Sequence, residues 1–135
     1  MSTYIAAYLV TAVVLFGLDF AWLSIATSRF YRAELGAMLL EKPNLLVAGL
    51  FYLVYAAGVV VFAVVPALDA GSWPRASLLG AALGLIAYGT YDFTNLATLK
   101  NWPTVVSFVD LAWGICLTSI SATLGFMVVR GVAAG

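Results

Sequence analysis

The sequence contains no histidine and a single cysteine among its 135 residues. Without histidine, imidazole catalysis and histidine-ligated haem or zinc are excluded. Cys116 has no partner for an intrachain disulfide, and the apolar residues around it predict a buried, unreactive thiol. The start, 1–4, also lacks the basic residues of a signal peptide, and the apolar stretch that follows contains Asp19. We therefore expect this stretch to be a retained transmembrane helix.

Charge is equally scarce, since 9% of the residues are charged and 64% are hydrophobic, with a mean hydropathy of +1.08. A soluble domain has about 25% charged residues. Six acidic and six basic side chains cannot cover a soluble globule of this size. A soluble enzyme, a secreted disulfide scaffold and a disordered tail are therefore excluded. Because the two signs balance, no surface for a polyanion is predicted, and nucleic acid is not an expected partner.

Apolar stretches long enough to cross a bilayer occupy 3–27, 44–68, 75–98 and 103–129. The hydrocarbon core of a membrane is about 30 Å thick, which takes roughly 20 helical residues. Helices are required because lipid cannot pair with free backbone groups, and the alternating pattern of barrel strands is missing. The sequence therefore predicts a single transmembrane domain over 1–135, an all-α integral membrane protein whose four helices form a compact bundle.

The longest connection, 28–43, has an amphipathic pattern. Its apolar side chains fall on one helical face, namely Tyr31, Leu35, Met38 and Leu39. The pattern predicts a short helix that lies in the membrane interface between the first two spans and ends at Pro43. The alternative is a polar loop with a few apolar residues.

Basic residues lie mostly at the span ends on one side of the predicted bundle. That side carries Arg29, Arg32, Lys42 and Lys100, and the opposite side carries Arg75 and Arg130. Cytoplasmic loops of membrane proteins are enriched in Lys and Arg, so the 28–43 side is expected in the cytoplasm and both termini outside. The bias is small.

Three aspartates fall inside the predicted spans, where ionisable side chains are costly and mark candidate functional sites. Asp19 precedes the end of the first span by eight residues, and Asp92 precedes Lys100 by eight. Asp110 follows the start of the fourth span by seven. Because neighbouring spans alternate in direction, all three lie about 10–12 Å from the same interface, at about 1.5 Å per residue. The chain thus places three acids in one layer from three helices.

The run Asp19-Phe20-Ala21-Trp22 of the first span recurs as Asp110-Leu111-Ala112-Trp113 in the fourth. Because these spans run in opposite directions, the match indicates an inverted repeat of the kind found in transporters, with chance similarity as the alternative. The spacing puts each Asp and Trp on one helix face. We expect each indole N–H to donate locally and each ring to shield the carboxyl from lipid.

Small and polar residues form one stripe on each of the last two spans. The third span carries Gly80, Gly84, Tyr88, Asp92 and Asn95, with Tyr91 beside them, and the fourth carries Ser107, Asp110, Gly114, Thr118, Ser121 and Gly125. A Gly-x-x-x-Gly pair allows close backbone approach, so both stripes are expected to face other helices. The alternative to a binding role is that these groups hold the helices together by hydrogen bonds.

Three neighbouring carboxyls in a low dielectric cannot all be ionised without partners. The interfacial basic side chains of Arg29, Arg32 and Lys100 could fold inward to meet them. A hard cation such as Mg²⁺ or Ca²⁺, held by the three aspartates and Asn95, would also complete the site. The spacing matches no specific metal motif, so no metal and no cofactor are predicted. The candidate ligand- or proton-binding residues are Asp19, Trp22, Tyr88, Tyr91, Asp92, Asn95, Asp110 and Trp113.

The run Tyr-Asp-Phe-Thr-Asn-Leu-Ala-Thr-Leu-Lys-Asn-Trp-Pro at 91–103 is distinctive. Together with 19–23, Pro43-Asn44, Phe51-Tyr52 and 110–114, it resembles the domain-of-unknown-function family 2177 over nearly the whole chain. The resemblance implies a small, stand-alone bacterial protein with four membrane helices, and therefore a location in the bacterial inner (plasma) membrane. It implies no activity, substrate or catalytic residue, because the function of that family is undefined.

Three functions remain open, and an enzyme is the least expected of them. The first is a protein that binds or transports a proton, a cation or a small polar or cationic solute, as small multidrug transporters do in dimers. The second is a subunit of a larger membrane complex, or an assembly partner, in which the acids are structural. The third is a membrane enzyme that modifies lipid, with acid–base or metal-assisted chemistry at the aspartates.

Overall fold

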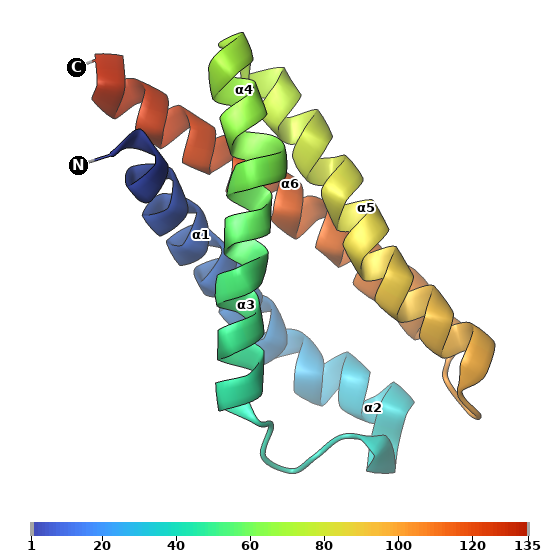
Figure 1. The fold of residues 1–135 in the computed structure, drawn as a ribbon. Helices are drawn as coiled ribbons and strands as arrows, with labels where there is room; N and C mark the ends of the chain where they lie inside the picture. Colours follow the sequence, from blue (N-terminus) through green and yellow to red (C-terminus); the bar gives the residue numbers. More distant parts are fainter. Residues whose placement is uncertain (1, 135) are drawn as a thin grey trace.

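Four long helical segments form the protein, as Figure 1 shows. The computed structural model describes residues 2–134 and contains helices but no strand within that range. α1 spans Thr3–Ala26, α5 spans Trp73–Thr98 and α6 spans Thr104–Ala134. The remaining segment is α3, Leu45–Val59, which continues through the π-helical turn η3, Val60–Val64, into α4, Val65–Ala70. The all-α membrane bundle predicted from the sequence is confirmed.

Capping side chains set the starts of three helices. Ser2 accepts a hydrogen bond from a backbone N–H of the first turn of α1, and Asn44 and Ser72 do the same for α3 and α5. Pro74 lies in the first turn of α5, where its missing N–H has no cost. Gly71 ends α4 with a φ of 63°, a left-handed conformation that favours glycine. These residues make the α4–α5 turn tight.

Neighbouring segments run in opposite directions. The start of α1 and the end of α6 lie at the same end of the bundle as the α4–α5 turn (Figure 1). The α5–α6 turn and α2, Arg32–Leu35, lie at the opposite end. Residues at matching distances from that opposite end therefore share a layer of the bundle.

By length and composition, the segments Thr3–Met38, Leu45–Ala70 and Thr104–Val132 are able to cross a membrane. α5 has 26 residues, which is also long enough, but its glycines and polar side chains make it less apolar. Its main partner is α6, and its polar stripe turns toward that helix. α5 thus differs from the other three segments in its lower hydropathy, although α1 and α6 also keep polar side chains inside the bundle.

The 28–43 connection differs from the predicted separate helix that ends at Pro43. α1 continues without a break into the π-helical turn η1, Thr27–Tyr31, and then into α2 and a short 3₁₀ turn, Gly36–Met38. α2 ends at Gly36, which has a φ of 55°, and the 3₁₀ turn ends at Met38, before Pro43 is reached. Tyr31 is buried and Leu35 packs beside it, but Met38 is exposed, so the predicted apolar face is only partly inside.

Small residues allow α5 and α6 to lie in close contact. A Cβ atom on Gly84 would collide with the Gly114 carbonyl oxygen and lie 2.9 Å from the Ile115 Cα. A Cβ on Gly114 would overlap the Tyr88 ring. Cys116 follows Gly114 by two residues, which turns it about 200° away from this contact. It is exposed rather than buried as predicted, because it lies on the outer face of α6.

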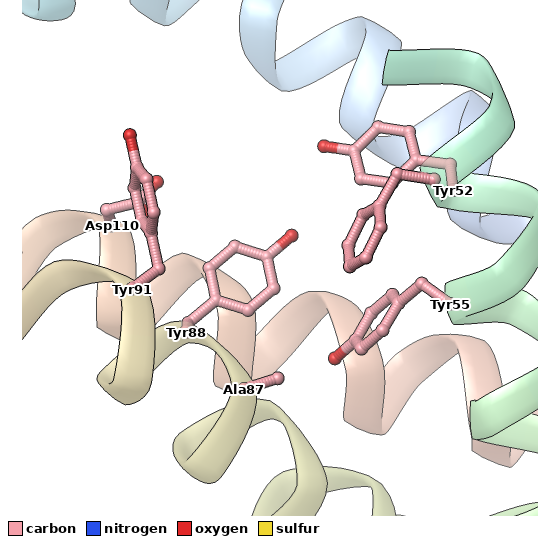
Figure 2. Close-up of a pocket in the computed structure, with 7 residues that line it drawn as sticks. Tyr52, Tyr55, Ala87, Tyr88, Tyr91 and Asp110 are labelled. Carbon is pink, nitrogen blue, oxygen red and sulfur yellow. The ribbon is translucent and has the colours of Figure 1, made fainter. Parts of the chain in front are cut away.

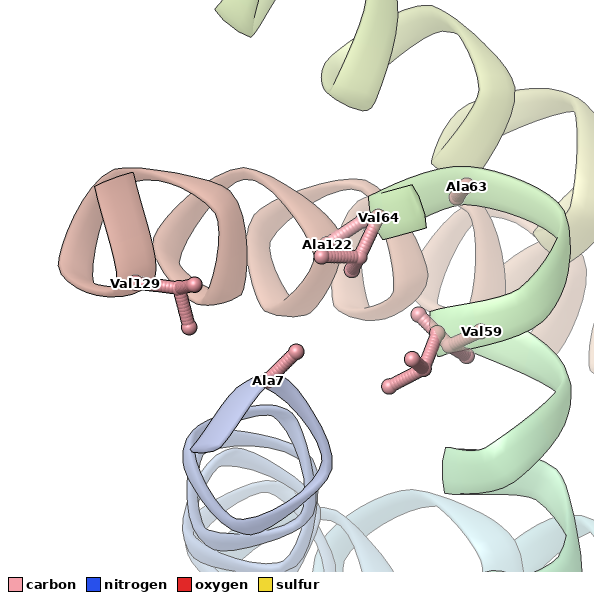
Figure 3. Close-up of a cluster of buried hydrophobic side chains, with 7 residues drawn as sticks. Ala7, Val59, Ala63, Val64, Ala122 and Val129 are labelled. Atoms are coloured by element: carbon pink, nitrogen blue, oxygen red, sulfur yellow. The ribbon is translucent and has the colours of Figure 1, made fainter. Parts of the chain in front are cut away.

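A cluster of small apolar side chains joins α1, η3 and α6 near the chain termini (Figure 3). Its labelled members are Ala7, Val59, Ala63, Val64, Ala122 and Val129. The packing fixes the upper halves of these segments against each other. By contrast, α5 contacts η3 and α4 more than it contacts α3, so the first half of α3 diverges from α5.

Candidate functional site

The three membrane aspartates lie in one layer of the bundle. On α5, the backbone carbonyl of Asp92 accepts a hydrogen bond of 2.7 Å from Ser107, which is one helical turn before Asp110 on α6. Asp19 on α1 accepts a hydrogen bond from Trp113, one turn after Asp110. α6 is thus the element that brings the three acids together.

Asp19 is fully engaged by other helices. One carboxyl oxygen accepts a hydrogen bond of 3.0 Å from the Trp113 indole of α6, and the other accepts from the Tyr52 hydroxyl of α3. The side chain is 3% exposed. Asp19 therefore ties α1, α3 and α6 together inside the bundle.

Asp110 begins the second Asp-x-x-Trp run and has a different partner. The Tyr31 hydroxyl of η1 donates to Asp110 at 2.7 Å and accepts from the Trp22 indole at 3.1 Å. The rings of Trp22 and Trp113 stack with centroids 4.7 Å apart and planes 10° from parallel. The two Asp-x-x-Trp runs thus pair across α1 and α6.

The predicted local donation of the indole is wrong for Trp113, which donates across to α1. The Trp22 indole donates to Tyr31 in the η1 continuation of its own helix, and reaches Asp110 only through that hydroxyl. Sequence spacing places Asp and Trp on one face but does not say which neighbouring helix that face meets. The helices cross closely enough for the contacts to be made between them.

Asp92 is the most enclosed of the three acids. It is 0% exposed, and neither carboxyl oxygen has a hydrogen-bond partner among the described residues. A buried carboxyl without a donor is costly as an anion, so Asp92 differs from Asp19 and Asp110, which both accept hydrogen bonds.

A cavity of about 430 Å³ lies beside this layer, between α3 and α5 with α6 as its floor (Figure 2). It is lined by Phe51, Tyr52, Tyr55, Ala87, Tyr88, Tyr91 and Asp110. Aromatic rings from two helices and one carboxyl thus share the lining, and Figure 2 shows Asp110 at the side of Tyr91, opposite Tyr52 and Tyr55. At the rim, Phe51 is 63% and Tyr91 is 56% exposed. The cavity exists because α3 and α5 diverge at this end of the bundle.

The hydroxyls of the cavity form a connected polar edge. Figure 2 shows the hydroxyl of Tyr88 directed toward that of Tyr52, which itself donates to Asp19. Tyr55 exchanges a hydrogen bond of 2.7 Å with Thr118 on α6. Two of the cavity hydroxyls, those of Tyr52 and Tyr55, are therefore hydrogen-bonded to other helices.

The predicted site residues divide into two groups. Those that line the cavity are Tyr88, Tyr91 and Asp110. Those that lie behind it, in the contacts between segments, are Asp19, Trp22, Asp92 and Trp113. Asn95 is half-buried one turn after Tyr91 on α5 and is absent from the cavity lining. The interfacial basic residues Arg29, Arg32 and Lys100 are exposed, and the partners of Asp19 and Asp110 are phenols and an indole instead.

Three aromatic residues of the second segment were missed as site residues. Phe51, Tyr52 and Tyr55 line the cavity, and their spacing places them on one helical face. That shared face was the signal in the sequence from which these residues could have been identified. Tyr31 was assigned only to the apolar face of the interfacial segment, yet its hydroxyl is the donor to Asp110.

Within the described part of the chain, no three acidic or thiol side chains are close enough to hold one metal ion. The three aspartates share a layer but point to different partners. A cation held by all three carboxyls, considered from the sequence, therefore has no support in the geometry.

Comparison with known proteins gives one match. The model of a family described as "Predicted membrane protein (DUF2177)" matches residues 4–127. No curated protein and no solved structure matches the chain. The family description supplies membrane location and no activity.

Proposed function

Because the chain belongs to the DUF2177 family of predicted membrane proteins and its cavity joins aromatic rings to one carboxyl, we propose that it binds a small organic cation within the membrane. The observation that carries the proposal is the set of phenol and phenyl rings around Asp110. Transport of this cation across the membrane is the activity that such a site would serve.

The chemistry of the cavity favours a cation with apolar substituents. The negative faces of aromatic rings attract cations, with about 0.5–1 kcal/mol at exposed sites and about 2 kcal/mol when water is removed. Asp110 supplies the carboxyl of the cavity lining, from α6. A bare metal ion would need several oxygen ligands, whereas an alkylated ammonium group is bound by ring faces and one carboxylate.

The size of the cavity agrees with this ligand class. At about 430 Å³ it lies within the range of roughly 300–1,000 Å³ that is usual for small-molecule sites. Its rim carries exposed Phe51 and Tyr91, so a ligand with apolar groups is matched at the entrance as well.

The same proposal includes a location and an orientation. We place the protein in the bacterial inner membrane with both termini outside, because Arg29, Arg32, Lys42 and Lys100 lie at the end that holds α2. The cavity is then in the cytoplasmic half of the bilayer. A homodimer or a larger membrane complex is compatible with the exposed apolar face of α3.

Calorimetric titration of the purified protein in lipid nanodiscs tests the proposal. The probes are choline and its neutral analogue, in which carbon replaces the quaternary nitrogen. Choline is expected to bind and the neutral analogue to bind at least about tenfold more weakly, because ring faces and Asp110 act on the charge. A titration with sodium chloride at the same concentration is the control for a cation that has no apolar groups.

Two substitutions make the test specific. Asp110→Asn is expected to weaken choline binding at least about tenfold, since it removes the charge at nearly constant volume. Asp69→Asn is the matched control, because Asp69 is an exposed acid in the last turn of α4, and this variant is expected to bind choline normally. Equal binding of choline and its neutral analogue, or unchanged binding by Asp110→Asn, would refute the proposal.

A second candidate function is a structural subunit of a membrane complex, and one observation favours it. Both oxygens of Asp19 are occupied by hydrogen bonds from other helices, as expected of an acid that holds a fold together. If all three acids act in this way, Asp110→Asn would lower the free energy of unfolding and would leave choline binding unchanged. Co-purification of the chain with fixed partners would support this alternative.

A further inference from the structure

The cavity lies at the depth of the hydrocarbon core and not at the membrane surface. The segment Leu45–Ala70 and α5 each contain 26 residues, so each is about 39 Å long at about 1.5 Å per residue. A hydrocarbon core of about 30 Å covers all but about 4–5 Å at either end of such a helix. Phe51 lies about 9 Å from the start of α3, and Ala87 lies about 17 Å from the end of α5. The other lining residues lie between these depths, so the whole cavity is within the hydrocarbon.

The cavity has a closed side and an open side. The closed side is formed by α6, which supplies Asp110, and the hydroxyls of Tyr52 and Tyr55 are tied to α1 and α6. On the open side lie Phe51 of α3 and Tyr91 of α5, which are both more than half exposed. In Figure 1, α1 and α6 pass behind α3 and α5, so within residues 2–134 no helix covers the open side. We call the gap between the Phe51 and Tyr91 rings the mouth of the cavity.

The surface around the mouth is apolar. The exposed side chains next to it are those of Leu50 and Val54 on α3 and Ile86 on α5. Thr90 is exposed there too, but its hydroxyl donates to the Ile86 carbonyl of its own helix, which leaves no free donor. No charged residue occurs in 44–68 or in 76–91. Because aqueous pathways in membrane proteins are lined by polar and ionisable groups, this mouth is matched to lipid and not to water.

We infer that the cavity opens sideways into the bilayer and that its ligand is an amphiphilic organic cation dissolved in the membrane. This inference rests on the proposed function and adds the class of the ligand. The ammonium group lies among the rings beside Asp110, and an unbranched alkyl chain leaves through the mouth and lies in the lipid along α3 and α5. Binding forms and breaks no covalent bond.

The site separates charge from apolar surface in the way that such a ligand does. Its lining offers one carboxyl, and the remaining side chains are aromatic except for Ala87. A hydrophilic cation would have to cross about 9 Å of helix depth without a polar group on α3 or α5 to guide it. An alkylated cation instead concentrates in the bilayer, where each methylene gains from leaving water. It therefore reaches the mouth at a high local concentration.

Titration of hexyl- and decyltrimethylammonium into the wild-type protein in nanodiscs tests where the chain lies. Empty nanodiscs give the partitioning of each ion into lipid. Referred to the free concentration in water, the affinity is expected to rise about fourfold for each added methylene, because the chain is bound in lipid. Referred to the concentration in the membrane, it should stay nearly constant. A cavity closed to lipid would have no room for the longer chain, and the affinity would fall with chain length on both scales.

A decyltrimethylammonium probe with a photoreactive diazirine in the middle of its chain locates the chain directly. Labelling of Leu50, Val54 and Ile86, identified by mass spectrometry, is expected to fall when excess choline occupies the cavity. Phe20 is the internal control, because it is exposed on the outer face of α1 and is labelled only by probe in the bulk lipid. Its labelling should not respond to choline.

Two variants connect the labelling to the cation site. Asp110→Asn is expected to lose the choline-sensitive part of the labelling, because the head of the probe is no longer held. Asp69→Asn, which alters an exposed acid in the last turn of α4, should keep it. Helical content and elution volume of each variant are compared with wild type first. The titrations and the wild-type labelling use the unmodified chain and do not depend on the folding of a variant.

The outcomes are distinct. Choline binding together with an affinity that rises with chain length and choline-sensitive labelling at the mouth supports the amphiphilic ligand. Choline binding with affinities that fall from hexyl to decyl overturns the sideways opening and leaves cation binding standing. Labelling at the mouth that ignores choline, as that of Phe20 does, has the same meaning. No choline binding by the wild type overturns the proposed function, and the ligand class with it.

Discussion

Trp22 and Trp113 allow a matched test of how strongly the two Asp-x-x-Trp runs hold the bundle. Both indoles belong to the same stacked pair, and each donates one hydrogen bond. Trp113 donates to the Asp19 carboxyl at 3.0 Å, and Trp22 donates to the Tyr31 hydroxyl at 3.1 Å. Replacing either residue with phenylalanine truncates the same ring in the same stack, so the two variants differ mainly in the acceptor that is lost.

The difference between the variants can be estimated from these contacts. Hydrogen bonds between helices in a membrane average about 0.6 kcal/mol and reach about 1.7 kcal/mol. Hydrogen bonds to carboxylates are stronger than those between neutral groups. We therefore expect Trp113→Phe to lower the free energy of unfolding by about 1 kcal/mol more than Trp22→Phe, which is about a fivefold difference in the equilibrium constant.

Reversible unfolding by SDS in mixed micelles, followed by far-ultraviolet circular dichroism, measures both variants on one scale. Repeating the pair in an Asp19→Asn background should reduce the excess cost of Trp113→Phe, because the carboxylate acceptor is gone. The reasoning is refuted if Trp22→Phe costs as much as Trp113→Phe, or if the Asp19→Asn background leaves the difference unchanged.

Further predictions concern helix packing and orientation. Gly84→Ala should destabilise the protein by about 1–3 kcal/mol in the same assay, because the added Cβ meets the backbone of α6. Gly89→Ala is its control on the same helix, since the nearest atom would be 3.7 Å away, and a comparable loss there would contradict the packing argument. In a Cys116→Ser background, Asp69→Cys should react with a membrane-impermeant thiol reagent in intact cells. Glu41→Cys should react only after permeabilisation, and the reverse pattern would invert the proposed orientation.

Hydropathy and helix geometry predict most of the architecture. Lipid excludes unpaired backbone, so long apolar stretches become helices, and a fixed rise per residue sets the depth of each side chain. That is why the sequence alone assigns Asp19, Asp92 and Asp110 to one layer of the bundle. The stripe of Gly80 and Gly84 likewise predicts the close α5–α6 contact, because only small residues permit it.

The rotations and angles between helices could not be read from the sequence. The pattern at 28–43 is amphipathic whether or not the helix is continuous with α1, so the unbroken η1 turn was missed. The cavity depends on the divergence of α3 from α5, which is a tertiary property. Phe51, Tyr52 and Tyr55 formed a visible aromatic face, but nothing in the sequence alone distinguishes a cavity wall from a lipid-facing surface.

The η3 turn divides the second segment into a part that packs on α5 and a part that does not. The packed cluster around Ala63 and Val64 holds η3 in place, whereas the first half of α3 contacts α5 little. This half is held by α1 instead, because Tyr52 donates to Asp19 and Tyr8 donates to the Leu53 carbonyl. The distance between the two aromatic walls of the cavity is therefore set by α1, through Asp19, although α1 contributes no residue to the lining.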